Sequence, residues 1–217
     1  MRAETLSVGG RQVHLWRGGE GPPLVLLHGG GGDAERHWSP VWDRLAARYD
    51  VIAPDLPGCG GSQAVTRSTL LSLVAWLDRL IDALGVGAVR LAGAEIGACL
   101  ARAYAASHPD RCDSLVLING GALPSASERL LARLGLGARL GRADPARMLS
   151  RGRTPRWAPT AHTLVFWTQD DATAPRAASR LAAQLPNAAF RLMPGKGRLP
   201  QVEAPAETAD ILLAFLG

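Results

Sequence analysis

A glycine-rich turn is the first part of this sequence with the means to do chemistry. His28 is followed by four glycines at 29–32, directly after an apolar run at 24–27. Glycines let a backbone approach a substrate oxygen closely and direct N–H groups at it. We therefore expect Gly29 and Gly30 to donate to an oxyanion, the negatively charged oxygen formed in acyl transfer. A flexible tight turn is the alternative interpretation.

Four further turns follow apolar segments in the same way. They are DLPGCGGS at 55–62, AGAEIG at 92–97, VFWTQDDATAP at 165–175 and GKGRLPQVEAP at 195–205. The apolar segments alternate with helical patterns, which predicts a mostly parallel sheet covered by helices on both faces. Ligands of such sheets bind beyond the carboxyl ends of the strands. We therefore expect the five turns to meet along one edge of the sheet.

Together these turns resemble the signature motifs of the α/β-hydrolase-fold superfamily. DLPGCGGS is similar to the family's D-x-P-G-x-G-x-S turn, and AGAEIG stands where the family carries G-x-S-x-G, the nucleophile elbow. The motifs keep the family's order and spacing from about residue 12 to residue 216. The resemblance implies an α/β-hydrolase fold, with a mostly parallel twisted sheet of about eight strands.

The resemblance also assigns three triad-equivalent positions, and two of them carry unexpected residues. The nucleophile position is Glu95, the acid position is Asp171, and the histidine position is Arg198. Glu95 has no hydroxyl to acylate, and Arg198 stays protonated and is no base. We therefore expect a degenerate catalytic triad beside the glycine turn, with Ile96 next to the nucleophile position as a second oxyanion donor.

The two unexpected residues are complementary in charge. Arginine can donate to two carboxylates at once. We therefore expect Glu95, Arg198 and Asp171 to form a carboxylate–guanidinium–carboxylate network in place of the usual hydrogen-bond chain. Either change alone would have left a charge without its partner, which is unfavourable in a partly buried site.

Three functions are compatible with such a centre. The main interpretation is a non-hydrolytic relative, a pseudoenzyme with a binding or accessory role. The second is a lyase, cyclase or isomerase that uses Glu95 as acid or base. The third is a hydrolase with unconventional residues, in which Glu95 is a carboxylate nucleophile, like the aspartate of dehalogenases of this fold, or in which other residues act. His37, which borders the pocket in this family, is a candidate replacement base, and a surface histidine at a helix start is the alternative.

Hydrophobic periodicity predicts the elements that must position these residues. Strands are expected at 5–8, 12–17, 24–27, 50–54, 88–92, 114–118, 163–167 and 189–193. Helices are expected at 38–49, 70–84, 96–107, 175–184 and 205–216. The length of 217 residues fits a single domain.

The segment 121–161 stands where relatives insert a cap domain. Its length allows only two short helices, at about 125–134 and 144–151, so we expect a reduced cap. It is rich in arginine, with Arg129, Arg133, Arg139, Arg142, Arg147 and Arg151 among its side chains. This charge predicts a surface for an acidic protein partner or a small anionic ligand. A solvated helix surface is the alternative.

Composition narrows the classes of function. The sequence is 47% hydrophobic and 20% charged, which is typical of a folded globular protein. It has no apolar run long enough for a membrane span and no secretory pattern at its start. The net charge of +5 comes from arginine with a single lysine, which resembles high-GC codon usage, so we infer no nucleic-acid binding. Three cysteines without metal-ligand spacing predict reduced thiols in the cytoplasm, with no metal and no cofactor.

Overall fold

A computed structural model describes residues 1–66, 69–121, 158–169, 174–194 and 197–217 of the chain. Its centre is an eight-stranded sheet in the order β1-β2-β4-β3-β5-β6-β7-β8. The strands are β1 (Arg2–Val8), β2 (Arg11–Gly18), β3 (Pro23–Leu27), β4 (Asp50–Pro54), β5 (Val89–Ala94), β6 (Cys112–Ile118), β7 (His162–Thr168) and β8 (Ala188–Met193). The predicted strand number is therefore confirmed.

The sheet is parallel except at its beginning. β1 and β2 form an antiparallel hairpin, and β2 pairs antiparallel with β4. Every pairing from β4 through β3, β5, β6 and β7 to β8 is parallel. The carboxyl ends of these strands therefore meet at one edge, as the sequence predicts, which is where ligands bind in such sheets.

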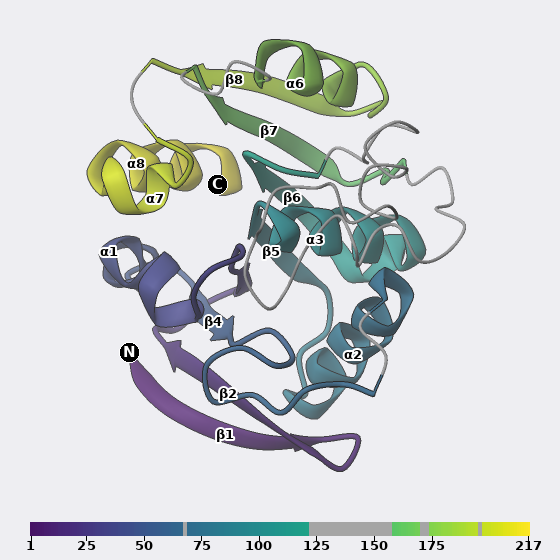
Figure 1. Cartoon of the computed structure of the whole chain (residues 1–217). Helices are drawn as coiled ribbons and strands as arrows, with labels where there is room; N and C mark the ends of the chain where they lie inside the picture. The colour runs from purple at the N-terminus through teal and green to yellow at the C-terminus, as the bar shows by residue number, and fades with distance from the viewer. Residues whose placement is uncertain (67–68, 122–157, 170–173, 195–196) are drawn as a thin grey trace.

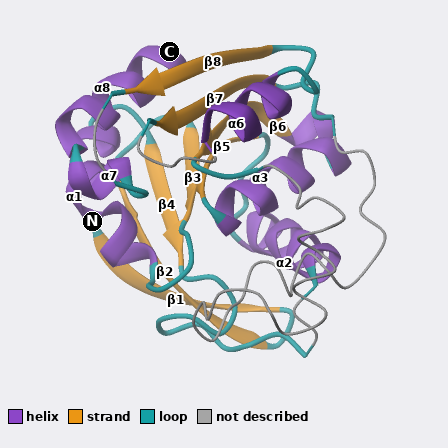
Figure 2. Cartoon of the chain, turned by 45° about the horizontal axis from the view of Figure 1, so that its top comes forward, coloured by secondary structure: helices purple, strands orange, loops and turns teal. Residues whose placement is uncertain are grey.

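Helices cover both faces of the sheet (Figure 1, Figure 2). The described helices are α1 (Ala34–Ala46), α2 (Leu70–Ala83), α3 (Ile96–Ser107), α6 (Ala174–Ala182), α7 (Pro200–Glu203) and α8 (Pro205–Leu216), with a short 3-10 turn at Pro109–Arg111. Figure 1 shows α1, α7 and α8 gathered on one side and α2 and α3 on the other. Alternate residues of one strand enter different cores. Leu24 and Leu26 pack with α1 and α8, whereas Val25 and Leu27 pack with α2 and α3.

The first helix begins earlier than predicted. α1 starts at Ala34 rather than Trp38, because the side chain of Asp33 accepts a hydrogen bond from the N–H of Arg36 and caps the helix. The predicted cap helices at 125–134 and 144–151 lie outside the described residues. Within the described ranges, no helix has the length and apolar character needed to span a membrane.

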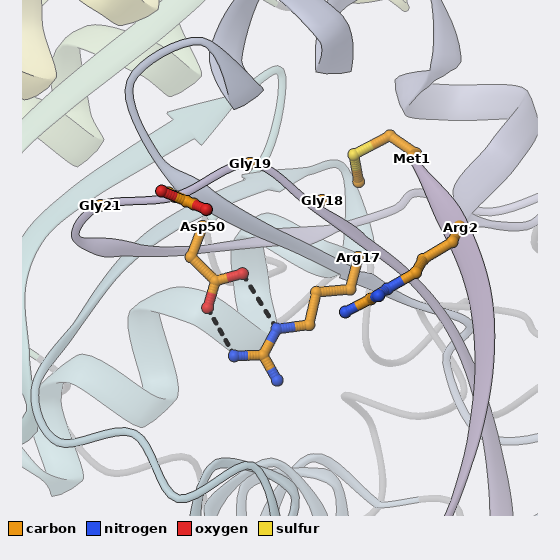
Figure 3. A pocket seen from close by; sticks show the side chains of 8 residues that line it. Met1, Arg2, Arg17, Gly18, Gly19, Gly21 and Asp50 are labelled. Carbon is orange, nitrogen blue, oxygen red and sulfur yellow. Dashed lines mark hydrogen bonds and ion pairs between the residues drawn. The ribbon is translucent and has the colours of Figure 1, made fainter.

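The amino edge of the sheet carries a brace between two strands (Figure 3). The guanidinium of Arg17 in β2 donates to both carboxylate oxygens of Asp50 in β4, at 2.9 and 2.6 Å. These two residues line an open pocket with Met1, Arg2, Gly18, Gly19, Glu20 and Gly21. The pocket lies at the opposite edge of the sheet from the five turns.

Candidate active site

Glu95 occupies a sharp turn between β5 and α3. Its φ is 50°, a conformation that non-glycine residues rarely adopt, and its N–H donates to the carbonyl of Ile118 at 3.0 Å. A Cβ on Gly97 would collide with the carbonyl of Leu27, and one on Gly93 would collide with the backbone of Gly97. The two glycines therefore let α3 pack against the sheet directly after residue 95, as the elbow motif predicts.

The carboxylate of Glu95 contacts both the glycine turn and the arginine. Oε2 accepts a hydrogen bond from the N–H of Gly30 at 3.1 Å. Oε1 lies 3.3 Å from Nη2 of Arg198, whose side chain is 67% exposed, whereas that of Glu95 is 19% exposed. The structure thus brings together two of the three residues that the resemblance places at triad positions. Asp171 lies outside the described residues, so its place in the network stays a prediction.

His28 joins the glycine turn to the DLPGCGGS turn. The N–H of Leu56 donates to Nε2 of His28 at 2.9 Å, so the ring carries its proton on Nδ1, which lies 2.7 Å from the carbonyl oxygen of Gly29. Burial lowers the pKa of His28 and keeps the ring neutral. His28 therefore fixes the shape of the turn.

His37 is buried, so the alternative interpretation of a surface histidine at a helix start is wrong. Its side chain is 1% exposed, and its Nδ1 accepts the N–H of Gly29 at 3.2 Å. Burial, helped by the nearby His28 and Arg36, lowers its pKa to about 4. Nδ1 is thus already used, and Nε2 carries the proton and has no hydrogen-bond partner within the described part of the chain. This arrangement does not suit the role of a base.

The glycine turn consequently differs from the predicted oxyanion hole. The N–H of Gly29 donates to His37, and that of Gly30 donates to Glu95. Both glycine donors are therefore satisfied within the protein. Ile96 is buried and begins α3, directly after the elbow. It lies where the donor next to residue 95 is expected.

Two polar residues at this edge were not predicted from the sequence. Asn119 follows β6 directly and has a φ of 44°, and Thr168 ends β7 with its side chain buried. The amide of Asn119 reaches the backbone of Arg198. Both residues lie directly at the end of a predicted strand, and this position could have identified them as candidate site residues.

The arginines predicted to form a binding surface, at 129–151, lie outside the described residues.

No other nucleophile or metal centre stands out in the described ranges. No group of three or more His, Cys, Asp or Glu side chains is arranged there to hold a metal ion. No disulfide joins any of Cys59, Cys99 and Cys112, all of which lie in the described ranges. Burial raises the pKa of the Cys59 and Cys99 thiols, and that of Cys112 to about 12, so all three stay protonated near neutral pH.

The chain belongs to the α/β hydrolase fold family, whose model matches residues 22–144. It is 36% identical over 111 residues to (E)-2-((N-methylformamido)methylene)succinate hydrolase of Acinetobacter baylyi, covering 51% of this chain and 42% of that protein. It is 32% identical over 117 residues to 2-hydroxy-6-oxo-6-phenylhexa-2,4-dienoate hydrolase of Burkholderia cepacia, covering 52% and 41%. The matched part thus spans about two fifths of each of these relatives, both of which are hydrolases.

Solved structures agree on the fold. The enol-lactonase of Burkholderia xenovorans LB400 has a TM-score of 0.83 and 20% identity, with 98% of this chain and 99% of that chain covered. A thermophilic esterase of Thermogutta terrifontis has a TM-score of 0.81 and 22% identity, with 100% and 98% covered. At this identity the likeness establishes the shared architecture alone.

Proposed function

We propose that this protein is a non-hydrolytic member of the α/β hydrolase family with a binding or accessory role. One observation carries the proposal: the Glu95 carboxylate holds the Gly30 N–H and the Arg198 guanidinium at the same time. A substrate oxyanion would need the N–H that Glu95 already occupies. A nucleophile at position 95 would need a base, and Arg198 cannot accept a proton.

The proposal also gives roles to Asp171 and to the arginines of the cap, which lie outside the described ranges. Arginine has five N–H donors, so Arg198 can bind a second carboxylate, and we assign that place to Asp171. The arginines of the reduced cap would bind an acidic protein or a small anion. We propose one domain over 1–217 and a cytoplasmic location, where the three cysteine thiols would stay reduced.

Hydrolysis by unconventional residues is the second candidate, and the names of the relatives favour it. In this route Oε1 of Glu95 attacks a substrate carbon and releases the leaving group. The product is a glutamyl ester at a saturated carbon or a mixed anhydride at the acyl carbon of an ester substrate. Water then adds to the glutamyl carbonyl, whose oxygen would become an oxyanion on the Gly30 N–H. The bond from Gly30 to Oε2 suits that step. The route still needs a base for the water, and the lone pair of His37 is held by Gly29. A lyase, cyclase or isomerase with Glu95 as base needs no such water.

Turnover of short p-nitrophenyl esters and labelling by a fluorophosphonate probe test the proposal. We expect neither from the wild-type protein. The double substitution Glu95→Ser with Arg198→His should gain both, because it frees the Gly30 N–H and supplies a hydroxyl and a base. Glu95→Ser alone is the matched control, since it has the hydroxyl without the base.

A labelling experiment separates the carboxylate route from the main proposal. If wild-type protein turns over an ester and Glu95→Gln does not, the non-hydrolytic assignment is wrong. Single turnover in ¹⁸O-water would then place ¹⁸O in the Glu95 peptide only if a covalent glutamyl intermediate forms and water attacks its glutamyl carbonyl, as the route requires. Turnover without such incorporation would contradict this route.

A further inference from the structure

The turn after β6 touches both members of the Glu95–Arg198 pair. On one side, the carbonyl of Ile118 accepts the N–H of Glu95 at 3.0 Å. Gly120 lies so close to the carbonyl of Glu95 that a Cβ would not fit. On the other side, Nδ2 of Asn119 donates to the carbonyl of Arg198 at 2.8 Å. Residues 118–120 therefore connect two segments that are far apart in the sequence.

Both ends of the Asn119 amide are used. Besides its bond to Arg198, Nδ2 donates to Oγ1 of Thr168 at 3.1 Å, and Oδ1 accepts the N–H of Thr168 at 2.9 Å. The N–H of Asn119 itself donates to the carbonyl of Phe166 at 3.0 Å. These bonds fix the side chain, although its backbone has a φ of 44°, which is unfavourable for most residues.

Thr168 extends the contact by one residue. Its hydroxyl is buried and donates to the carbonyl of Gly197 at 2.8 Å. The carbonyls of Gly197 and Arg198 are therefore held by the ends of β7 and β6. The loop is therefore anchored directly before the arginine side chain.

Anchoring matters because the Arg198 side chain is 67% exposed. An exposed ion pair is weak, since holding a long side chain in one geometry opposes the attraction. Fixing the backbone from which the side chain starts reduces the number of conformations that miss Glu95. We propose that Asn119, assisted by Thr168, is a positioning residue that places the Arg198 guanidinium on Glu95. This inference rests on the pair in the proposed function and adds what holds it together.

The rate at which phenylglyoxal modifies Arg198, followed by peptide mass spectrometry on the whole protein, tests the inference. Glu95→Gln should raise the rate about two- to fivefold, because it frees the guanidinium from an exposed pair. Asn119→Gly should raise it by a similar factor. Glycine accepts a φ of 44° without strain, so this variant removes all hydrogen bonds of the Asn119 side chain and leaves the backbone conformation available. The exposed Arg48 is the internal reference.

Thr168 supplies a second pair of variants if Asn119→Gly does not fold. Thr168→Val keeps the shape but loses the bond to Gly197, and should also raise the Arg198 rate. Thr168→Ser keeps the hydroxyl and should restore the wild-type rate. A role limited to folding would lower stability in Asn119→Gly and Thr168→Val without changing the Arg198 rate.

The possible results distinguish the existence of the Glu95–Arg198 pair from the positioning role of Asn119. An unchanged rate in Asn119→Gly, or in Thr168→Val, together with a raised rate in Glu95→Gln, overturns the positioning role and leaves the pair intact. An unchanged rate in Glu95→Gln shows that Arg198 is not paired in solution, which overturns both the pair and the inference.

Discussion

Two arginine–carboxylate pairs lie at opposite edges of the sheet and differ in almost every respect. Arg17 binds Asp50 with two bonds, and the side chains are 27% and 16% exposed. Asp50 raises the pKa of Arg17, since it accepts a hydrogen bond from the guanidinium. β2 and β4 already pair as neighbours, so little freedom remains to be lost when this bridge forms.

The pair at the carboxyl edge has one contact instead of two. Arg198 reaches Glu95 through Nη2 alone, at 3.3 Å, and its side chain is 67% exposed. It joins an elbow to a loop rather than two strands. The first pair therefore braces the sheet, whereas the second is weak by itself and depends on its surroundings.

The largest expected effect comes from the buried histidines that only the carboxyl edge has. The unfolded chain protonates His37 near pH 6.5, whereas the folded protein does so only near its lowered pKa of about 4. Protonation of His37 therefore favours the unfolded chain. The free energy of unfolding is at its full value above pH 6.5 and decreases as the pH falls from 6.5 toward 4. We expect the free energy of unfolding to drop by about 2 kcal/mol between pH 7.5 and pH 5.

Urea unfolding at the two pH values measures this difference. His37→Asn keeps an acceptor for the N–H of Gly29 and removes the titration, so it should show a smaller drop. His28, whose pKa is also lowered, accounts for what remains. Arg17→Met should keep the full drop. Equal drops in His37→Asn and the wild type would refute this assignment.

The second effect comes from the brace at the amino edge. Arg17→Met leaves the half-buried Asp50 without its two charged hydrogen bonds, and we expect a loss of about 1–1.5 kcal/mol in the free energy of unfolding, at the low end because both side chains are partly exposed. Salt should change this loss little, because the pair is partly buried. Replacing Asp50 as well should recover part of it. A loss below about 0.5 kcal/mol would place this pair in the same class as an ordinary exposed one.

The smallest effect is expected at the carboxyl-edge pair. Glu95→Gln keeps an acceptor for the N–H of Gly30 and removes the charge, and we expect less than about 1 kcal/mol of destabilisation. The same holds for Arg198→Met. About 1 M salt should remove most of the difference from the wild type. A larger loss that persists in salt would make the two pairs alike and contradict the comparison.

The sequence predicted the sheet and the edge at which the turns meet. This succeeded because strand ends and glycines are local requirements: no Cβ fits at Gly93 or Gly97, so the elbow can be recognised without knowing its neighbours. The contact between Glu95 and Arg198 could be predicted because their turns meet at the same edge of the sheet and their charges are opposite. Asp171 and the cap helices at 125–134 and 144–151 stay predictions.

The features that were not predicted correctly from the sequence share a physical cause. The burial of His37 and the partner of the Gly29 N–H depend on how α1 packs against the glycine turn, which no local pattern specifies. The early start of α1 depended on the capping bond from Asp33. The role of Asn119 arises from hydrogen bonds to residues 168 and 198, which are distant in the sequence and meet only in the folded protein.

The elbow has a consequence for how this family changes over time. Gly93, Gly97 and the bond to Ile118 set the backbone at residue 95, and none of them involves its side chain. A mutation at this position can therefore exchange the reacting group while the inherited scaffold stays the same. Chemistry and architecture can therefore vary separately within one family, so membership of the fold family does not by itself determine which reaction a member carries out.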